Sequence, residues 1–253
     1  MTIPSIDAVF TNASSGGNNN LTTLDVASVV TNGLPLLAWV TLNDNGADAP
    51  VFSSVVLDPG GGNETAFSVV ASSAVQWDVS TTRFRGEWWV LSPTSPSGTF
   101  TVRCTGNQGT HGYTMTILRL ANADTANLLG TPVTGTGSDD VPTVTVTPGS
   151  IDSRVVAGVA QRNLKTYTPG ADDAGHSALQ CDGVSSRDHS GWVGSTPAAT
   201  TTAFTVSVTA NSTDTWGIVG LAVKGVASEG GAIGPLLAGH LIDHSILHGR
   251  LLR

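Results

Sequence analysis

Residues 98–121 read GTFTVRCTGNQGTHGYTMTILRLA, and this stretch decides the fold class. At its two ends, residues 98–105 and 113–121, polar and apolar side chains alternate with period two. In a strand, such alternation places the apolar side chains on one face and the polar side chains on the other. We therefore predict two half-buried strands here.

Strand patterns of the same kind occupy most of the chain. Residues 34–42 (LPLLAWVTL) and 51–57 (VFSSVVL) are mostly apolar and are predicted as core strands. Further strands are predicted at 66–70, 74–79, 83–91, 141–147, 154–160, 203–209 and 216–223. Turns rich in Gly and Pro separate them, and no long stretch shows a helical period. The sequence predicts an all-β fold, an antiparallel β-sandwich or jelly roll with an extended C-terminal tail. One large domain over residues 1–226 is preferred to two small ones.

Composition limits the function classes. Charged residues make up 12% of the chain, against about 25% in an average protein. The net charge of −8 argues against a nucleic-acid partner, which would require clustered Lys and Arg. Cys104 and Cys181 are expected to be two buried thiols rather than a disulfide. The N-terminus lacks the pattern of a signal peptide, and no apolar run is long enough to span a membrane. We expect synthesis in a cytoplasm.

The tail of the chain, residues 227–253, carries an unusual apolar pattern. After a Gly-rich linker, residues 232–253 read AIGPLLAGHLIDHSILHGRLLR, with apolar doublets every five residues. A five-residue step turns a helix by about 140°, so no helix could bury every doublet against one surface. We predict an assembly segment surrounded by other subunits, with Arg250 and Arg253 pairing with acidic groups of the partner. The predicted apolar interface residues are Leu236, Leu237, Leu241, Ile242, Ile246, Leu247, Leu251 and Leu252.

Four segments together resemble a known family. These are NGLPLLAWVTL (32–42), WWVLSPTSPSGTFTVRCTG (88–106), YTMTILRLANAD (113–124) and WGIVGLAVKGV (216–226). Their succession is similar to a β-sandwich module of bacteriophage virion proteins, in which an early apolar strand, a central hairpin with an Asn-Pro turn and a closing Trp-containing strand follow one another. Here Ser92-Pro93 replaces the Asn-Pro pair, and Pro35 interrupts the early strand.

The resemblance implies a virion component. The preferred role is that of a capsid decoration (cement) protein. The related alternatives are a head-fibre protein and a tail-associated protein. It would bind phage capsid or tail proteins and form homo-oligomers, with a trimer expected by analogy with decoration proteins. We expect a non-enzymatic structural protein, made in the host cytoplasm and located in the virion, without a cofactor and without a membrane or nucleic-acid partner.

The residues that carry chemistry form no recognisable catalytic pattern. His240, His244 and His248 have metal-ligand spacing, but Gly239 and Gly249 oppose the helix that this spacing requires. The loops with Asp139-Asp140 and Asp172-Asp173 lack the order of ligands of a calcium loop. Glu87 lies beside Trp88-Trp89 but has no identifiable partner carboxylate, and no nucleophile elbow occurs. The sequence therefore predicts no catalytic residue and no metal site.

The tryptophan residues indicate an alternative function, the binding of a carbohydrate or a receptor. Flat aromatic rings can stack on sugars, and one of the adjacent Trp88 and Trp89 should point outward from a strand. Trp77 and Trp192 are near predicted turns. The possible ligand-binding aromatics are thus Trp77, Trp88 and Trp192, and the alternative function is a carbohydrate- or receptor-binding module of a phage tail or fibre tip.

Overall fold

A computed structural model describes residues 2–14, 21–44, 50–79, 82–92, 95–106, 110–182 and 188–226. Every regular element in these ranges is a β-strand, and all strand pairs are antiparallel, which confirms the predicted fold class. The tail, with its apolar doublets, Arg250, Arg253 and three histidines, lies outside the described residues. Within those residues there is no helix long and apolar enough to cross a membrane.

Strands β1 to β10 form an N-terminal sandwich of two sheets. Its inner sheet contains β1 (Ser5–Ala13), β10 (Thr110–Ala121), β3 (Leu36–Asp44) and β8 (Thr82–Leu91), in that order, with β6 (Ser68–Val69) and β7 (Val75–Val79) both pairing with β8. Its outer sheet contains β2 (Thr23–Val30), β9 (Thr99–Gly106), β4 (Phe52–Leu57) and β5 (Thr65–Ala66).

Strands β11 to β18 form a C-terminal sandwich in the same way. Its inner sheet contains β11 (Val133–Gly137), β18 (Trp216–Lys224), β13 (Ser153–Arg162), β16 (His189–Ala198) and β15 (Ala174–Cys181). Its outer sheet contains β12 (Thr143–Val146), β17 (Phe204–Ala210) and β14 (Tyr167–Pro169).

The two sandwiches share one topology. The inner-sheet order β1-β10-β3-β8 matches β11-β18-β13-β16, and the outer-sheet order β2-β9-β4 matches β12-β17-β14. In the N-terminal sandwich this is the strand order of a jelly roll. The sequence carries the same repetition: FTVRCT (100–105) in β9 matches FTVSVT (204–209) in β17, and ILRLA (117–121) in β10 matches IVGLA (218–222) in β18. The two halves of the chain therefore duplicate one topology.

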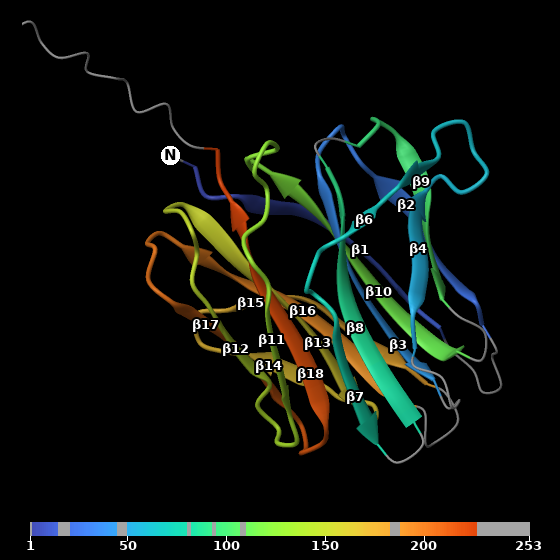
Figure 1. The fold of residues 1–253 in the computed structure, drawn as a ribbon, viewed down its shortest axis with the longest axis vertical. Helices are drawn as coiled ribbons and strands as arrows, with labels where there is room; N and C mark the ends of the chain where they lie inside the picture. Colours follow the sequence, from blue (N-terminus) through green and yellow to red (C-terminus); the bar gives the residue numbers. More distant parts are fainter. Residues whose placement is uncertain are drawn as a thin grey trace, which may run out of the picture.

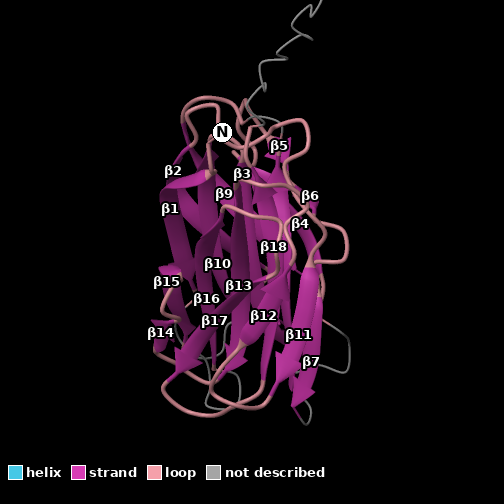
Figure 2. Cartoon of the chain, turned by 90° about the vertical axis from the view of Figure 1, so that its left-hand side faces the viewer, coloured by secondary structure: helices cyan, strands magenta, loops and turns pink. Residues whose placement is uncertain are grey.

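The inner sheets pack on each other, so the molecule has four layers (Figure 1). Figure 2 shows the C-terminal outer sheet lying over the inner strands behind it. An inner strand is therefore covered on both faces. In β3, Leu36 and Ala38 point into the core of the N-terminal sandwich, whereas Leu37 and Trp39 point into the interface between the sandwiches. Two covered faces explain the nearly continuous apolar run of this strand.

The preferred single sandwich over residues 1–226 differs from this arrangement, because the described residues form two sandwiches. They are joined by a large apolar interface, in which Trp39 and Trp88 lie with their ring centroids 5.1 Å apart. Each indole donates a hydrogen bond across the interface, Trp39 Nε1 to the carbonyl of Val159 and Trp88 Nε1 to that of Val219, both at 3.1 Å. Short strands with frequent turns look alike in one sandwich and in two, so the strand pattern could not separate them.

Candidate functional site

Two of the three tryptophans proposed to face a ligand are buried. Trp88 is 0% exposed and Trp192 is 1% exposed. The expectation that either Trp88 or Trp89 faces solvent is wrong, because β8 belongs to an inner sheet. Trp88 enters the interface between the sandwiches, and Trp89 enters the core of the N-terminal sandwich. Trp192 packs in the core of the C-terminal sandwich.

Trp77, the third candidate, is half-buried on the edge strand β7. Its ring stacks on Phe84, with centroids 5.4 Å apart and an angle of 12° between the planes. The Trp77 ring also covers Gly217 of β18, where an added Cβ would lie 2.6 Å from it. These contacts occupy much of the indole, so Trp77 contributes mainly to packing between the sandwiches.

The acidic candidates have structural partners. Glu87 is buried and accepts a hydrogen bond from Arg85 at 3.2 Å. In the turn after β11, Asp139 Oδ1 accepts hydrogen bonds from the Val141 amide and from Trp216 Nε1, both at 3.0 Å. Asp173 Oδ2 accepts one from the Ser207 amide at 2.9 Å. Across the described ranges, no three His, Cys, Asp or Glu side chains gather in a group that could hold a metal ion.

A Ser–His contact occurs, but the serine is inaccessible. His176 Nε2 lies 2.7 Å from Ser195 Oγ, which also accepts a hydrogen bond from Arg154 Nη1 at 3.0 Å. Ser195 is fully buried. Burial, and then the charge of Arg154, lower the pKa of His176. A nucleophile must reach its substrate, so this chain of side chains has a structural role in joining β13, β15 and β16.

His176 and His189 lie in segments that were not among the predicted strands, but both segments are strands in the structure. His176 lies in β15, and His189 begins β16. His189 is buried between the sandwiches, where its Nε2 is 2.9 Å from Thr41 Oγ1, which in turn is 2.6 Å from Thr114 Oγ1. Gly and Pro in these segments suggested loops. In β16, burial on both faces removes the alternation that would have identified a strand, whereas β15 is a largely exposed edge strand with few apolar side chains.

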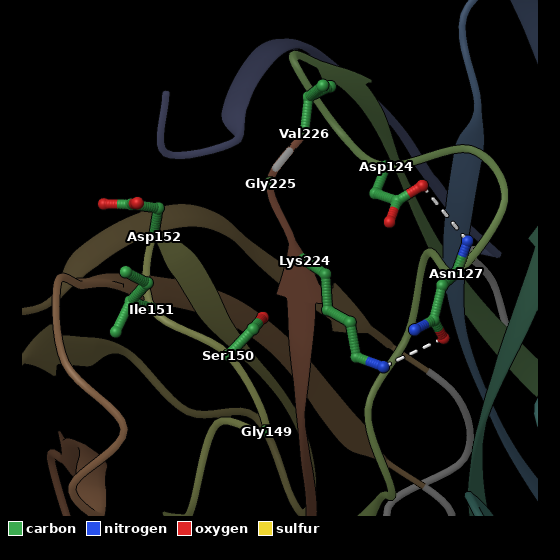
Figure 3. A pocket seen from close by; sticks show the side chains of 9 residues that line it. All are labelled: Asp124, Asn127, Gly149, Ser150, Ile151, Asp152, Lys224, Gly225 and Val226. Atoms are coloured by element: carbon green, nitrogen blue, oxygen red, sulfur yellow. Dashed lines mark hydrogen bonds between the residues drawn. The ribbon is translucent and has the colours of Figure 1, made fainter. Parts of the chain in front are cut away.

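A cavity lies where the chain leaves the C-terminal sandwich. Its volume is about 280 Å³. Its lining comes from the end of β18 and from two loops, one following β10 and one between β12 and β13 (Figure 3). The lining residues are Asp124, Asn127, Gly149, Ser150, Ile151, Asp152, Lys224, Gly225 and Val226. The N-terminal residues are close by, since a Cβ on Gly225 would lie 2.5 Å from the carbonyl oxygen of Thr2.

Hydrogen bonds hold one wall of this cavity in place, and exposed apolar side chains lie at its opening. Lys224 Nζ donates to Asn127 Oδ1 at 2.9 Å, and the backbone N–H of Asn127 donates to Asp124 Oδ1 at 3.2 Å. In contrast, Ile151 is 46% exposed and Val226 is 52% exposed. A concave site that combines apolar side chains with a few polar groups has the usual composition of a binding site. We therefore take this tail-base cavity as the candidate functional site.

Comparisons with known proteins add no relative. No family model, no curated protein and no solved structure matches this chain.

Sequence reasoning missed the tail-base cavity, although part of its pattern was visible. Pro148-Gly149 is one of the Gly- and Pro-rich turn signals, and residues 225–235 were interpreted as a flexible linker into the tail. The cavity forms because β18 ends beside the loop that follows β10, in the other sandwich. Only the packing of the two sandwiches brings these segments together.

Proposed function

We propose that this protein is a non-enzymatic structural protein of a bacteriophage virion, most simply a capsid decoration protein. It attaches to the particle, or to its own copies, through the C-terminal tail. The observation that carries this proposal is where the described chain ends. Val226 lines a cavity with exposed apolar side chains, and the sequence that follows it, residues 227–253, carries the repeated apolar doublets.

The fold is compatible with this role. Jelly rolls with two packed sheets recur in viral capsid proteins, although the same fold also serves lectins and enzymes. The sandwiches use their own large aromatic side chains for internal packing, including Trp39, Trp88 and Trp192. Among the described residues, two exposed large apolar side chains, Ile151 and Val226, lie at the base of the tail.

The energetic scale of tail binding is sufficient for assembly. Burying one Leu or Ile side chain contributes about 1.5–3 kcal/mol, before the cost of ordering the segment is subtracted. The tail has four apolar doublets, so even partial burial gives a useful affinity. In general, Gly-rich linkers allow a tail to reach a site away from its own domain.

Deletion of residues 232–253 tests the proposal. Because residues 2–226 contain both complete sandwiches, the shortened protein should remain folded by circular dichroism. Light scattering should give a defined oligomer for the full chain and a monomer for a chain of residues 1–228. The deletion should also abolish co-purification with particles. A shortened protein that still binds particles would contradict the proposal.

One observation favours the alternative function, a carbohydrate- or receptor-binding module. A shallow cavity of about 270 Å³ between β14 and β15 is lined in part by Tyr167, His176 and the edge of Trp192. Aromatic side chains beside hydrogen-bonding groups suit a sugar ring. A glycan screen with the full chain and with Tyr167→Ala tests this function. Binding that is lost in the variant would support it, and no binding by either protein would eliminate it.

A further inference from the structure

We propose that the tail-base cavity binds the segment Arg250–Arg253 of a second copy of this chain. This inference rests on the proposed assembly function, because it names the surface that the tail recognises. The segment reads Arg-Leu-Leu-Arg, an apolar doublet with a cation on each side. Each feature of that segment has a counterpart at the cavity.

The apolar doublet matches the mouth of the cavity. Leu251 and Leu252 would cover Ile151 and Val226, which are among the most exposed large apolar side chains of the described residues. The volume of about 280 Å³ lies near the lower end of the range of ligand cavities, so a pair of leucine side chains suits it better than a helix does.

The charges also match. Figure 3 shows Asp152 on one side of β18 and Asp124 on the other. Asp152 Oδ2 is buried, and Asp124 Oδ1 accepts hydrogen bonds from the backbone amides of Ala126 and Asn127, so the two carboxylates attract a cation through their charge rather than through these oxygen atoms. The one cation of the lining, Lys224, already donates to Asn127. An arginine on each side of a leucine doublet therefore brings one cation to each aspartate, and arginine is suited to pairing with carboxylates.

The linker is long enough to reach a neighbour. Residues 227–249 separate the base of the tail from the segment. A flexible chain of this length spans about 25–30 Å on average, comparable to the width of a small domain. Passing the tail from each copy to the next closes a ring, or a pair when two copies exchange tails. Such exchange joins copies, which an own-tail contact would not do.

Cysteine cross-linking tests the contact in the full-length protein. One chain carries Ile151→Cys, and a second, differently tagged chain carries Leu252→Cys. The native Cys104 and Cys181 are buried and should not interfere. Under a mild oxidant such as diamide, we expect a covalent product that contains both tags. In the matched control, the first chain carries Val69→Cys instead of Ile151→Cys. Val69 lies in the N-terminal sandwich and is as exposed as Ile151, so this pair should give only the background yield of cross-linked product.

Three outcomes separate this inference from the proposed function. Equal cross-linking at positions 151 and 69 would overturn the inference, but would leave tail-mediated assembly standing if the tail deletion still abolished the oligomer. A chain carrying both Ile151→Cys and Leu252→Cys that closes only on itself would overturn the second copy as the occupant. A charge test adds support: Arg250→Glu with Arg253→Glu should abolish the oligomer, because carboxylates would then lie beside Asp124 and Asp152. An unchanged oligomer would count against the contact.

Discussion

At the residue scale, His176 shows how burial sets the chemistry of one side chain. Its pKa is lowered by burial and then by Arg154, so the folded state favours the neutral ring. The unfolded chain takes up the proton near the ordinary pKa of about 6.5, where folded His176 does not. The free energy of unfolding therefore falls as the pH drops below about 7, until the folded pKa is reached.

We expect His176→Gln to flatten this part of the stability profile. Glutamine can still form a hydrogen bond with Ser195, as donor or acceptor, but does not titrate. Urea unfolding between pH 7.5 and pH 5 measures the difference, which amounts to about 1.4 kcal/mol for each unit by which the pKa is lowered. Asp173 provides a control of opposite sign: burial raises its pKa, so its contribution falls as the pH rises above about 4. Parallel profiles for the variant and the natural protein would contradict the prediction.

At the element scale, two arginines hold strands together in different environments. Arg103 on β9 lies opposite Asp25 on β2 and binds it through two contacts of 2.7 Å, but both side chains are about 40% exposed. Arg119 on β10 is only 10% exposed; it binds Asp7 at 2.8 Å and also donates to the carbonyl of Val30. Asp7 occupies a bulge in β1, which directs it towards Arg119.

The difference predicts unequal effects of mutation. Asp25→Asn should lower the free energy of unfolding by less than about 1 kcal/mol, because exposed pairs contribute little. Arg119→Met should lower it by about 1–3 kcal/mol, because the Val30 carbonyl loses its donor and Asp7 loses its cation. Chemical denaturation of both variants measures this. Equal losses would show that burial does not control these pairs.

The same scale shows what the sequence could predict. The strands around Leu36, Trp89 and Ile117 were located correctly, because their apolar content is high or alternates. β16 was missed because its glycines and Pro197 resemble a loop, while its two faces are buried. The duplication was missed too, although FTVRCT and FTVSVT were visible. The cavity could not be predicted, since Asp124 and Ile151 meet only after the sandwiches pack.

At the scale of the whole molecule, the sandwiches are related by an approximate twofold axis. β10 contacts β16 as its counterpart β18 contacts β8, and β1 contacts β15 as β11 contacts β7. This is the reciprocal pattern of a symmetric dimer, here within one chain. The side chains have diverged, however. Strand register places Trp39 and Trp88 where the other sandwich has Ala160 and Gly191. Large side chains on one sandwich thus meet small ones on the other.

This complementarity should make the two sandwiches unfold together. Trp39 lies against Gly158, where an added Cβ would overlap the indole, and its hydrogen bond to Val159 crosses the interface. We expect one calorimetric transition for the natural protein, with equal calorimetric and van't Hoff enthalpies. Trp39→Ala should lower the stability by about 3–5 kcal/mol and split the transition, because it leaves a void between the sandwiches. Trp39→Phe, the matched control, fills most of that void and should keep one transition. Two separate transitions in the natural protein would mean that each sandwich is stable without the other. The paired large and small residues would then set how the sandwiches are oriented but would not couple their unfolding.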